Sequence, residues 1–278
     1  MLKKIIYTVS VLFFIIFIFG AYSLRYQKEE KESAEYLFET TFLKTGESDS
    51  IILESQNRTI LINTADKESG RKITRFLNSK GIEEVDCIII TDFNDSCIGG
   101  FPIVSDRVKI KNVIHPAYKG QGECFENYRK KLSEKNINII SAEKNISFKA
   151  DDLDFNVYMT KTEFEENSNR SLVTSVTHGG KSFLFTGDIN SERVMELLNA
   201  DIDKYDFVTA PSHGLYFEGL TDFYSAVSPY FTVITDEYNT ETDKTEEILH
   251  KLKSNIYHTK DGLIKVFSDG ITLKALQE

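Results

Sequence analysis

Residues 85–100 read VDCIIITDFNDSCIGG, and this stretch decides the fold. Its first part, Val85 to Ile90, is an apolar run broken by one aspartate, which predicts a strand buried on both faces of a sheet. The rest is a short polar segment that ends in Gly99-Gly100 and predicts a tight loop. Such a loop brings several side chains to one spot and is typical of a metal or catalytic centre, yet this one contains no histidine.

The segments around this stretch alternate between strand and helix patterns. Two β-hairpins are predicted, at 50–63 and at 171–188, the second turned on Gly179-Gly180. A helix over 68–80 follows the first hairpin, and the final third of the chain repeats strand, helix, strand. This order predicts a four-layer αββα sandwich of mixed α+β and α/β character, with two sheets face to face and helices outside. A doubly wound parallel sheet is the alternative, and the hairpins disfavour it.

Residues 5–24, IIYTVSVLFFIIFIFGAYSL, carry no charge and follow Lys3 and Lys4. As a helix they would span about 30 Å, the thickness of the hydrocarbon layer of a bilayer. We interpret them as a transmembrane anchor, because the apolar core is longer than that of a typical signal peptide. The alternative is a secretory signal cut after the small-residue pattern at 21–23, which would release a secreted protein.

The anchor predicts how the whole chain is organised. Residues 1–4 would be a short cytoplasmic N-terminus, and 5–24 a single pass through the cell membrane. Residues 25–35 would be a charged linker, and 36–278 one extracytoplasmic domain. The lipid bilayer is therefore a predicted partner through residues 5–24.

Composition narrows the classes of function. The net charge of −10 disfavours a nucleic-acid surface, which needs many cations to neutralise phosphates. The three cysteines, Cys87, Cys97 and Cys124, are odd in number and widely spaced, so they predict neither a disulfide framework nor a zinc knuckle. The chain has no P-loop, no dinucleotide fingerprint and no G-x-S-x-G serine nucleophile.

Six fragments, in the same order along the chain, resemble the motifs of metallo-β-lactamase-fold hydrolases. Among these hydrolases, the hydrolase-like domain of the competence DNA-uptake protein ComEC is the most similar branch. The resemblance covers the chain from about residue 38 onward. The fragments are GESDSIIL at 46–53 for "GQGDSILI", LINTA at 61–65 for "LIDTG", the loop frame at 86–100, the hairpin at 171–188 for "NSLVL…FLFTGD", APSHG at 210–214 for "HHG", and the closing strands at 261–270.

The resemblance implies the αββα fold and a centre for one or two Zn²⁺ or Mn²⁺ ions, which would generate a hydroxide from a bound water. The ligands in that family come from the loop pattern T-H-x-[HD]-x-D-H-x-G-G, the aspartate of "TGD" and the "HHG" loop. This chain carries Asp188 and His213 at two of those positions. The other positions hold Asp92, Asn94, Ser96, Cys97 and Ser212, and the "LIDTG" motif has become LINTA, with Asn63 and Ala65.

Asn94, Ser96 and Ser212 are degenerate ligand positions, because neutral amides and hydroxyls bind Zn²⁺ weakly. The leading prediction is therefore a domain without catalytic residues or cofactor, which binds or scaffolds an unknown protein or small molecule. Cys97 would then be a small core residue, Asp188 a turn cap, and His213 bonded locally.

The alternative prediction keeps the chemistry of the family. Asp92, Cys97, Asp188 and His213 would hold one Zn²⁺ or Mn²⁺ ion in an active phosphodiesterase-like or nuclease-like hydrolase. Two other histidines are predicted to be structural or solvated: His115, at a strand end, and His178, in a hairpin turn.

Overall fold

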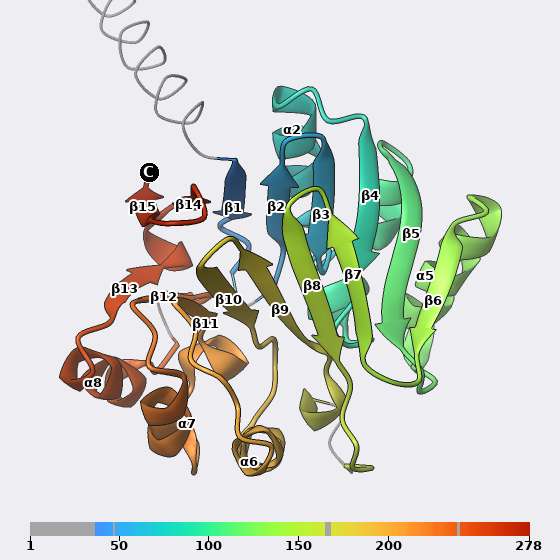
Figure 1. Cartoon of the computed structure of the whole chain (residues 1–278). Helices are drawn as coiled ribbons and strands as arrows, with labels where there is room; N and C mark the ends of the chain where they lie inside the picture. The colour runs from blue at the N-terminus through green and yellow to red at the C-terminus, as the bar shows by residue number, and fades with distance from the viewer. Residues whose placement is uncertain (1–36, 47, 165–167, 238–239) are drawn as a thin grey trace, which may run out of the picture. The chain divides into compact units, whose positions relative to one another are not determined.

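The computed structural model describes residues 37–46, 48–164, 168–237 and 240–278, and within them two large β-sheets form the centre of the domain (Figure 1). The first sheet has eight strands, in the order β15 (Leu273–Gln277), β14 (Ile264–Ser268), β1 (Phe38–Phe42), β2 (Ile51–Ser55), β3 (Arg58–Ile62), β4 (Glu84–Ile89), β5 (Lys109–Pro116) and β6 (Asn138–Ala142). The second sheet has seven strands, in the order β13 (Asn255–His258), β12 (Phe231–Ile234), β11 (Phe207–Thr209), β10 (Lys181–Phe185), β9 (Val173–His178), β8 (Leu153–Tyr158) and β7 (Ile146–Ala150).

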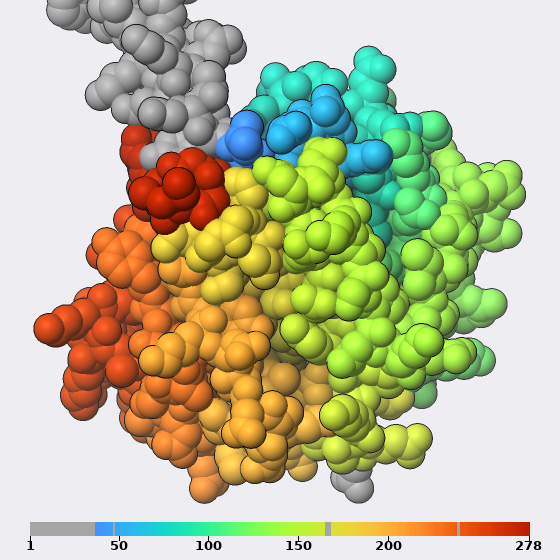
Figure 2. All heavy atoms as spheres, viewed as in Figure 1, coloured from blue at the N-terminus to red at the C-terminus, as the bar shows by residue number. Residues whose placement is uncertain are grey.

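Each sheet is antiparallel in one part and parallel in the other. Strands β3 to β6 run parallel in the first sheet, and β10 to β13 run parallel in the second. The predicted hairpins are confirmed as β2–β3 and β9–β10. In Figure 2 the red C-terminal residues lie close to the blue residues of β1, since β14 pairs with that strand.

Helices cover the outer face of each sheet (Figure 1). The first sheet carries α2 (Gly70–Ser79), α3 (Asp95–Ile98), α4 (Phe101–Ser105) and α5 (Gly122–Glu134). The second sheet carries α6 (Ser191–Asn199), α7 (Leu220–Val227) and α8 (Asp243–Lys251). Three short 3₁₀ turns complete the described elements: η1 (Ser168–Arg170), η2 (Pro211–Gly214) and η3 (Thr259–Asp261).

Three buried apolar clusters hold these layers together. The central cluster lies between the sheets, where Phe42 and Phe207 approach to 5.6 Å between ring centroids. The second joins the first sheet to its helices, and the third joins the second sheet to its own. The order of layers is therefore helix, sheet, sheet, helix, as predicted, and the doubly wound single sheet is wrong.

Strand alternation explains why residues 85–90 are so apolar. In a strand, successive side chains point to opposite faces. Cys87 and Ile89 enter the cluster between the sheets, while Ile88 and Ile90 pack against the helices. The prediction that this strand is buried on both faces is confirmed.

The prediction that His178 is solvated is wrong. Its side chain is buried and hydrogen-bonds Ser268 Oγ through Nδ1 and Asp152 Oδ2 through Nε2, both at 2.9 Å. The physical reason is that the turn after β14 covers this hairpin: Gly180 N–H donates to Gly270 O at 2.7 Å. His115 is structural as predicted, between Ser141 Oγ and Tyr128 Oη, each at 3.2 Å.

The predicted anchor at 5–24, together with the segments at 1–4 and 25–35, lies outside the described residues. Within the described ranges, no helix combines the length and the apolar character that crossing a bilayer requires. The anchor and the domain boundaries therefore stay predictions.

Candidate metal centre

The candidate centre lies where loops from both sheets meet. Asp92 follows β4 and Asp188 follows β10, while His213 lies in η2, directly after β11. These three strands belong to the parallel parts of the sheets, whose carboxyl ends commonly carry ligand sites in α/β proteins. A fourth residue, Asp49, comes from the loop before β2.

Asp188 lies in direct contact with His213 and Asn94 at the middle of the centre. His213 Nε2 lies 3.2 Å from Asp188 Oδ1, and Asn94 Nδ2 donates to Asp188 Oδ2 at 2.9 Å. Burial opposes the ionisation of Asp188, but the contacts with His213 and Asn94 outweigh it and hold its pKa below the usual range. Asp188 is therefore a carboxylate bound by two other loops rather than the cap of its own turn.

The backbone around His213 has an unusual conformation that aims its ring. Ser212, His213 and Gly214 have φ values of 45°, 56° and 82°, in the left-handed region that non-glycine residues rarely adopt. Nδ1 of His213 lies 3.0 Å from the carbonyl oxygen of Thr235. Because a carbonyl oxygen can only accept a hydrogen bond, Nδ1 is the donor and carries the hydrogen. Nε2 consequently faces Asp188 either as a second N–H of a charged imidazolium or as a lone pair directed at a cation.

Asp49 completes the cluster and was missed in the sequence. Its side chain is buried and its Oδ1 has no hydrogen-bond partner among the described residues, while His213 Nδ1 lies 3.9 Å away. Burial raises its pKa, and the neighbouring Asp188 adds to the rise. The signal was present, since Asp49 stands in the fragment that resembles "GQGDS", but only tertiary packing brings it to Asp188 and His213.

The other candidate residues are placed differently. Asp92 turns away to Tyr118, whose hydroxyl donates to Asp92 Oδ1 at 2.5 Å, and burial raises the pKa of Asp92. Cys97 is near the cluster, with its Sγ 3.9 Å from Asp188 Oδ2, but burial raises the pKa of its thiol well above normal. Without a metal this thiol is protonated, so Cys97 would have to release its proton to act as a ligand.

The degenerate positions are satisfied by protein partners. Ser96 Oγ donates to Asn94 Oδ1 at 2.7 Å, and Ser212 Oγ donates to Ile189 O at 2.9 Å. Asn63, in the altered "LIDTG" motif, accepts Thr91 N–H at 2.8 Å and donates to Thr91 Oγ1 at 2.8 Å. These side chains therefore hydrogen-bond within and between the loops and stabilise them.

Three side chains of the centre lie close enough together to hold one metal ion. Ligand atoms of Asp49, Asp188 and His213 all lie within 4.8 Å of one another. Two carboxylates and one imidazole are a donor set that Zn²⁺ or Mn²⁺ accepts, with a water in a further position. Among the described residues, no other group of three or more His, Cys, Asp and Glu side chains offers ligand atoms this close together.

Comparisons with known proteins identify the fold. No family model matches the chain. ComE operon protein 3 of Bacillus subtilis is 24% identical over 197 residues, which cover 68% of this chain and 25% of that protein, so the chain spans about a quarter of its curated relative.

Two solved structures have a fold similar to that of this chain. The metallo-β-lactamase fold protein YhfI of Bacillus subtilis superposes with a TM-score of 0.59, at 9% identity, over 80% of this chain and 95% of that one. The CmlA β-hydroxylase superposes with a TM-score of 0.57, at 9% identity, over 87% of this chain and 54% of that one. The chain has the metallo-β-lactamase fold.

Proposed function

We propose that this protein is a non-hydrolytic binding or scaffolding domain of metallo-β-lactamase fold, anchored at the outer face of a cell membrane by residues 5–24. The observation that supports it is the state of Asp188, the carboxylate expected to bridge metal ions. Both of its oxygens face nitrogen groups of the protein, Asn94 Nδ2 and His213 Nε2. The amide of Asn94 presents a hydrogen-bond donor where a ligand lone pair would be required.

The test is the metal content and activity of the full-length chain, purified in mild detergent. We expect far less than one Zn or Mn per chain by elemental mass spectrometry. We also expect no hydrolysis of a nitrophenyl phosphodiester above the buffer rate with either metal added.

The outcome that overturns the proposal is one metal per chain together with hydrolysis that a chelator abolishes. Asp188→Ala and His213→Ala should then lose both properties. His250→Ala, on the exposed side of α8, is the matched control and should keep them.

The second candidate is a hydrolase with a single metal ion. It is favoured by the buried Oδ1 of Asp49, which accepts no hydrogen bond from any described residue. A buried carboxylate oxygen without a hydrogen bond is costly, and a cation held with Asp188 and His213 would relieve that cost. Such an ion would lower the pKa of a bound water and supply hydroxide near neutral pH. This candidate predicts that Asp49→Asn, which keeps the shape of the side chain, lowers metal affinity as strongly as His213→Ala.

The weak likeness to ComE operon protein 3 also suggests a relation to the competence machinery. We do not extend it to DNA binding, because the net charge of −10 opposes contact with phosphates. A fold shared with a protein does not carry its function.

A further inference from the structure

A small pocket lies beside the candidate metal centre, at the ends of β5, β6 and β8. Its volume is about 280 Å³, near the lower limit for small-molecule sites. Much of its wall is apolar, and its charged side chains are Lys161, Glu163 and Arg170. The apolar lining residues include Pro116, Ala142, Met159 and Leu172.

Arg170 is the distinctive group of this pocket. Its guanidinium carbon lies 4.1 Å from the centroid of the Tyr118 ring, close enough for a cation–π contact. Among the residues that the structure describes, no carboxylate lies within 4.0 Å of this guanidinium. Stacking on a ring leaves the N–H donors of arginine, which lie in its plane, available for carboxylate or phosphate oxygens.

Tyr118 is itself held in place. Its hydroxyl donates to Asp92 Oδ1, and Phe93 packs edge-on against its ring at 5.2 Å between centroids. Burial, with Asp92 as neighbour, raises the pKa of Tyr118, so the phenol stays neutral and keeps donating. The Tyr118 ring on which Arg170 stacks is therefore held in a fixed position. Through its bond to Asp92, the same ring connects the pocket to the loop after β4.

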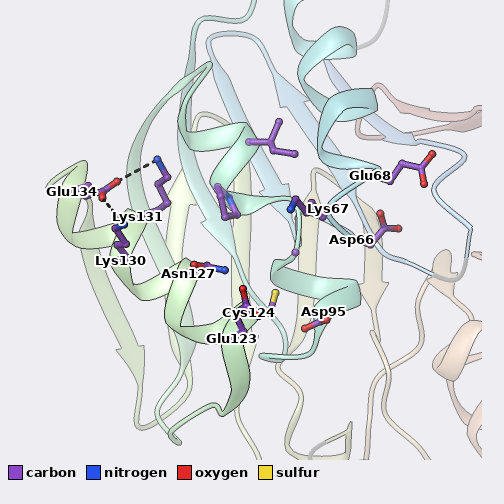
Figure 3. Close-up of a pocket in the computed structure, with 13 residues that line it drawn as sticks. Asp66, Lys67, Glu68, Asp95, Glu123, Cys124, Asn127, Lys130, Lys131 and Glu134 are labelled. Atoms are coloured by element: carbon purple, nitrogen blue, oxygen red, sulfur yellow. Dashed lines mark ion pairs between the residues drawn. The ribbon is translucent and has the colours of Figure 1, made fainter.

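A larger groove on the outer side of the first sheet also contains basic side chains, but these form ion pairs (Figure 3). Its volume is about 540 Å³, and its Lys130 and Lys131 both lie within ion-pair distance of Glu134, at 3.7 Å and 3.2 Å. Those cations already have carboxylate partners. Arg170 stacks on a neutral ring and forms no ion pair within 4.0 Å among the described residues, and the described carboxylate that interacts with its charge is Asp92, on the far side of the Tyr118 hydroxyl.

We infer that the pocket binds a small organic anion, whose phosphate or carboxylate group contacts Arg170 and whose apolar part lies against Met159 and Leu172. Lys161 lines the same pocket and adds a second positive charge, against one negative charge from Glu163. The inference rests on the proposed binding function and gives it a class of ligand.

The experiment uses phenylphosphonate and benzoate as probes with the full-length chain in detergent, after chelator treatment and dialysis. Isothermal titration should detect binding of at least one anion, while neutral benzyl alcohol should not bind. Comparing the two anions tells a phosphate site from a carboxylate site. Arg170→Gln should weaken binding about tenfold or more, because a charged hydrogen bond is lost.

Arg129→Gln is the matched control, since Arg129 also lies over a ring, that of Phe125 at 5.9 Å, but does not line this pocket. It should bind as the natural chain does. Lys161→Gln, at an exposed position, should show a smaller loss and serves if Arg170→Gln fails to fold. Absence of binding by both anions, or equal affinity in Arg170→Gln, would overturn the inference.

This result is independent of the metal test. Phenylphosphonate has no hydrolysable ester and the metal has been removed, so an active hydrolase would not mimic binding in the pocket. Metal-dependent hydrolysis, measured separately, would refute the proposed function without testing the anion site. Absence of anion binding would refute the anion site and leave the proposed function as it stands.

Discussion

Cys97 stands at a position where the hydrolases whose motifs this chain resembles have a histidine ligand, and its thiol lies between Thr91 and Asp188. Sγ is 3.6 Å from Thr91 Oγ1 and 3.9 Å from Asp188 Oδ2. Burial raises the pKa of this thiol, and the charge of Asp188 raises it further. In the absence of a metal the thiol is therefore expected to be unreactive.

We predict that iodoacetamide leaves Cys97 and Cys87 unmodified in the native chain. Both are buried, and burial raises the pKa of Cys87 to about 12. Cys124 is partly exposed, so it should react first, though slowly, because burial and Asp95 raise its pKa to about 12. Peptide mass spectrometry with and without denaturant measures this, and native labelling of Cys97 at the rate of Cys124 would contradict it.

Asn63 shows how a replaced motif residue acquires a structural role. It is fully buried with φ of 58° and makes two hydrogen bonds to Thr91 at 2.8 Å. We predict that Asn63→Ala lowers the free energy of unfolding by about 2–4 kcal/mol, because it leaves the buried Thr91 N–H unpaired.

The control for Asn63 is Asn136→Ala. Asn136 has a similar φ of 50° but is exposed, so only the left-handed backbone cost of about 1 kcal/mol should appear. Urea unfolding of the three chains gives both values. Equal losses in the two variants would show that the bonds to Thr91 contribute nothing.

Among the elements, α4 packs closely on the loop after β3. Gly100 N–H donates to Ala65 O at 2.8 Å, and a Cβ at Gly100 would collide with the carbonyl oxygen of Thr64. We predict that Gly100→Ala costs about 3 kcal/mol, since backbone cannot move aside cheaply. Gly81→Ala, with φ of +70° and open space around its Cβ position, should cost only about 1 kcal/mol. Thermal unfolding measures both, and a smaller loss in Gly100→Ala than in Gly81→Ala would contradict this packing.

Strand β5 carries a histidine that should make stability depend on pH. Burial lowers the pKa of His115 to about 4, below the ordinary value of 6.5. As pH falls from 6.5 to 4, the unfolded chain binds a proton that the folded chain does not, so stability decreases. We predict that His115→Gln makes the urea midpoint less dependent on pH in that window. His250→Gln, on the exposed side of α8, should keep the dependence, and a matching flattening there would refute the assignment.

Across the whole molecule, a polar network joins the two sheets at the end of β9. His178 of the second sheet bonds Ser268 of the first, and Ser55 of the first sheet donates to Asp152 Oδ1 at 2.9 Å. We predict that His178→Ala costs about 2–4 kcal/mol, because it leaves buried polar partners unsatisfied and opens a cavity beside Phe38. Calorimetry measures the stability of this variant, with the exposed His250→Ala as control. If His178→Ala loses no more stability than the control, the network does not stabilise the fold.

Most of the fold followed from local patterns in the sequence. The apolar run at 85–90 predicted a strand buried on both faces, and the patterns at 50–63 and 171–188 predicted two hairpins. Together these features imply two sheets with helices outside. Helices α3, α4 and α6 were not predicted. Two of them have only four and five residues, too few for a helical period to show.

By itself, the sequence determined which residue types stand at positions 91–100, and from them it predicted a loop that resembles a metal loop in its frame but carries no histidine. Only the tertiary structure decided which side chains meet. Asp49, Asp188 and His213 come from loops far apart in the chain, and they converge because two sheets pack face to face. Likewise, His178 is buried because a distant turn covers it. Local periodicity carries no information about such contacts, since they depend on the packing of whole layers.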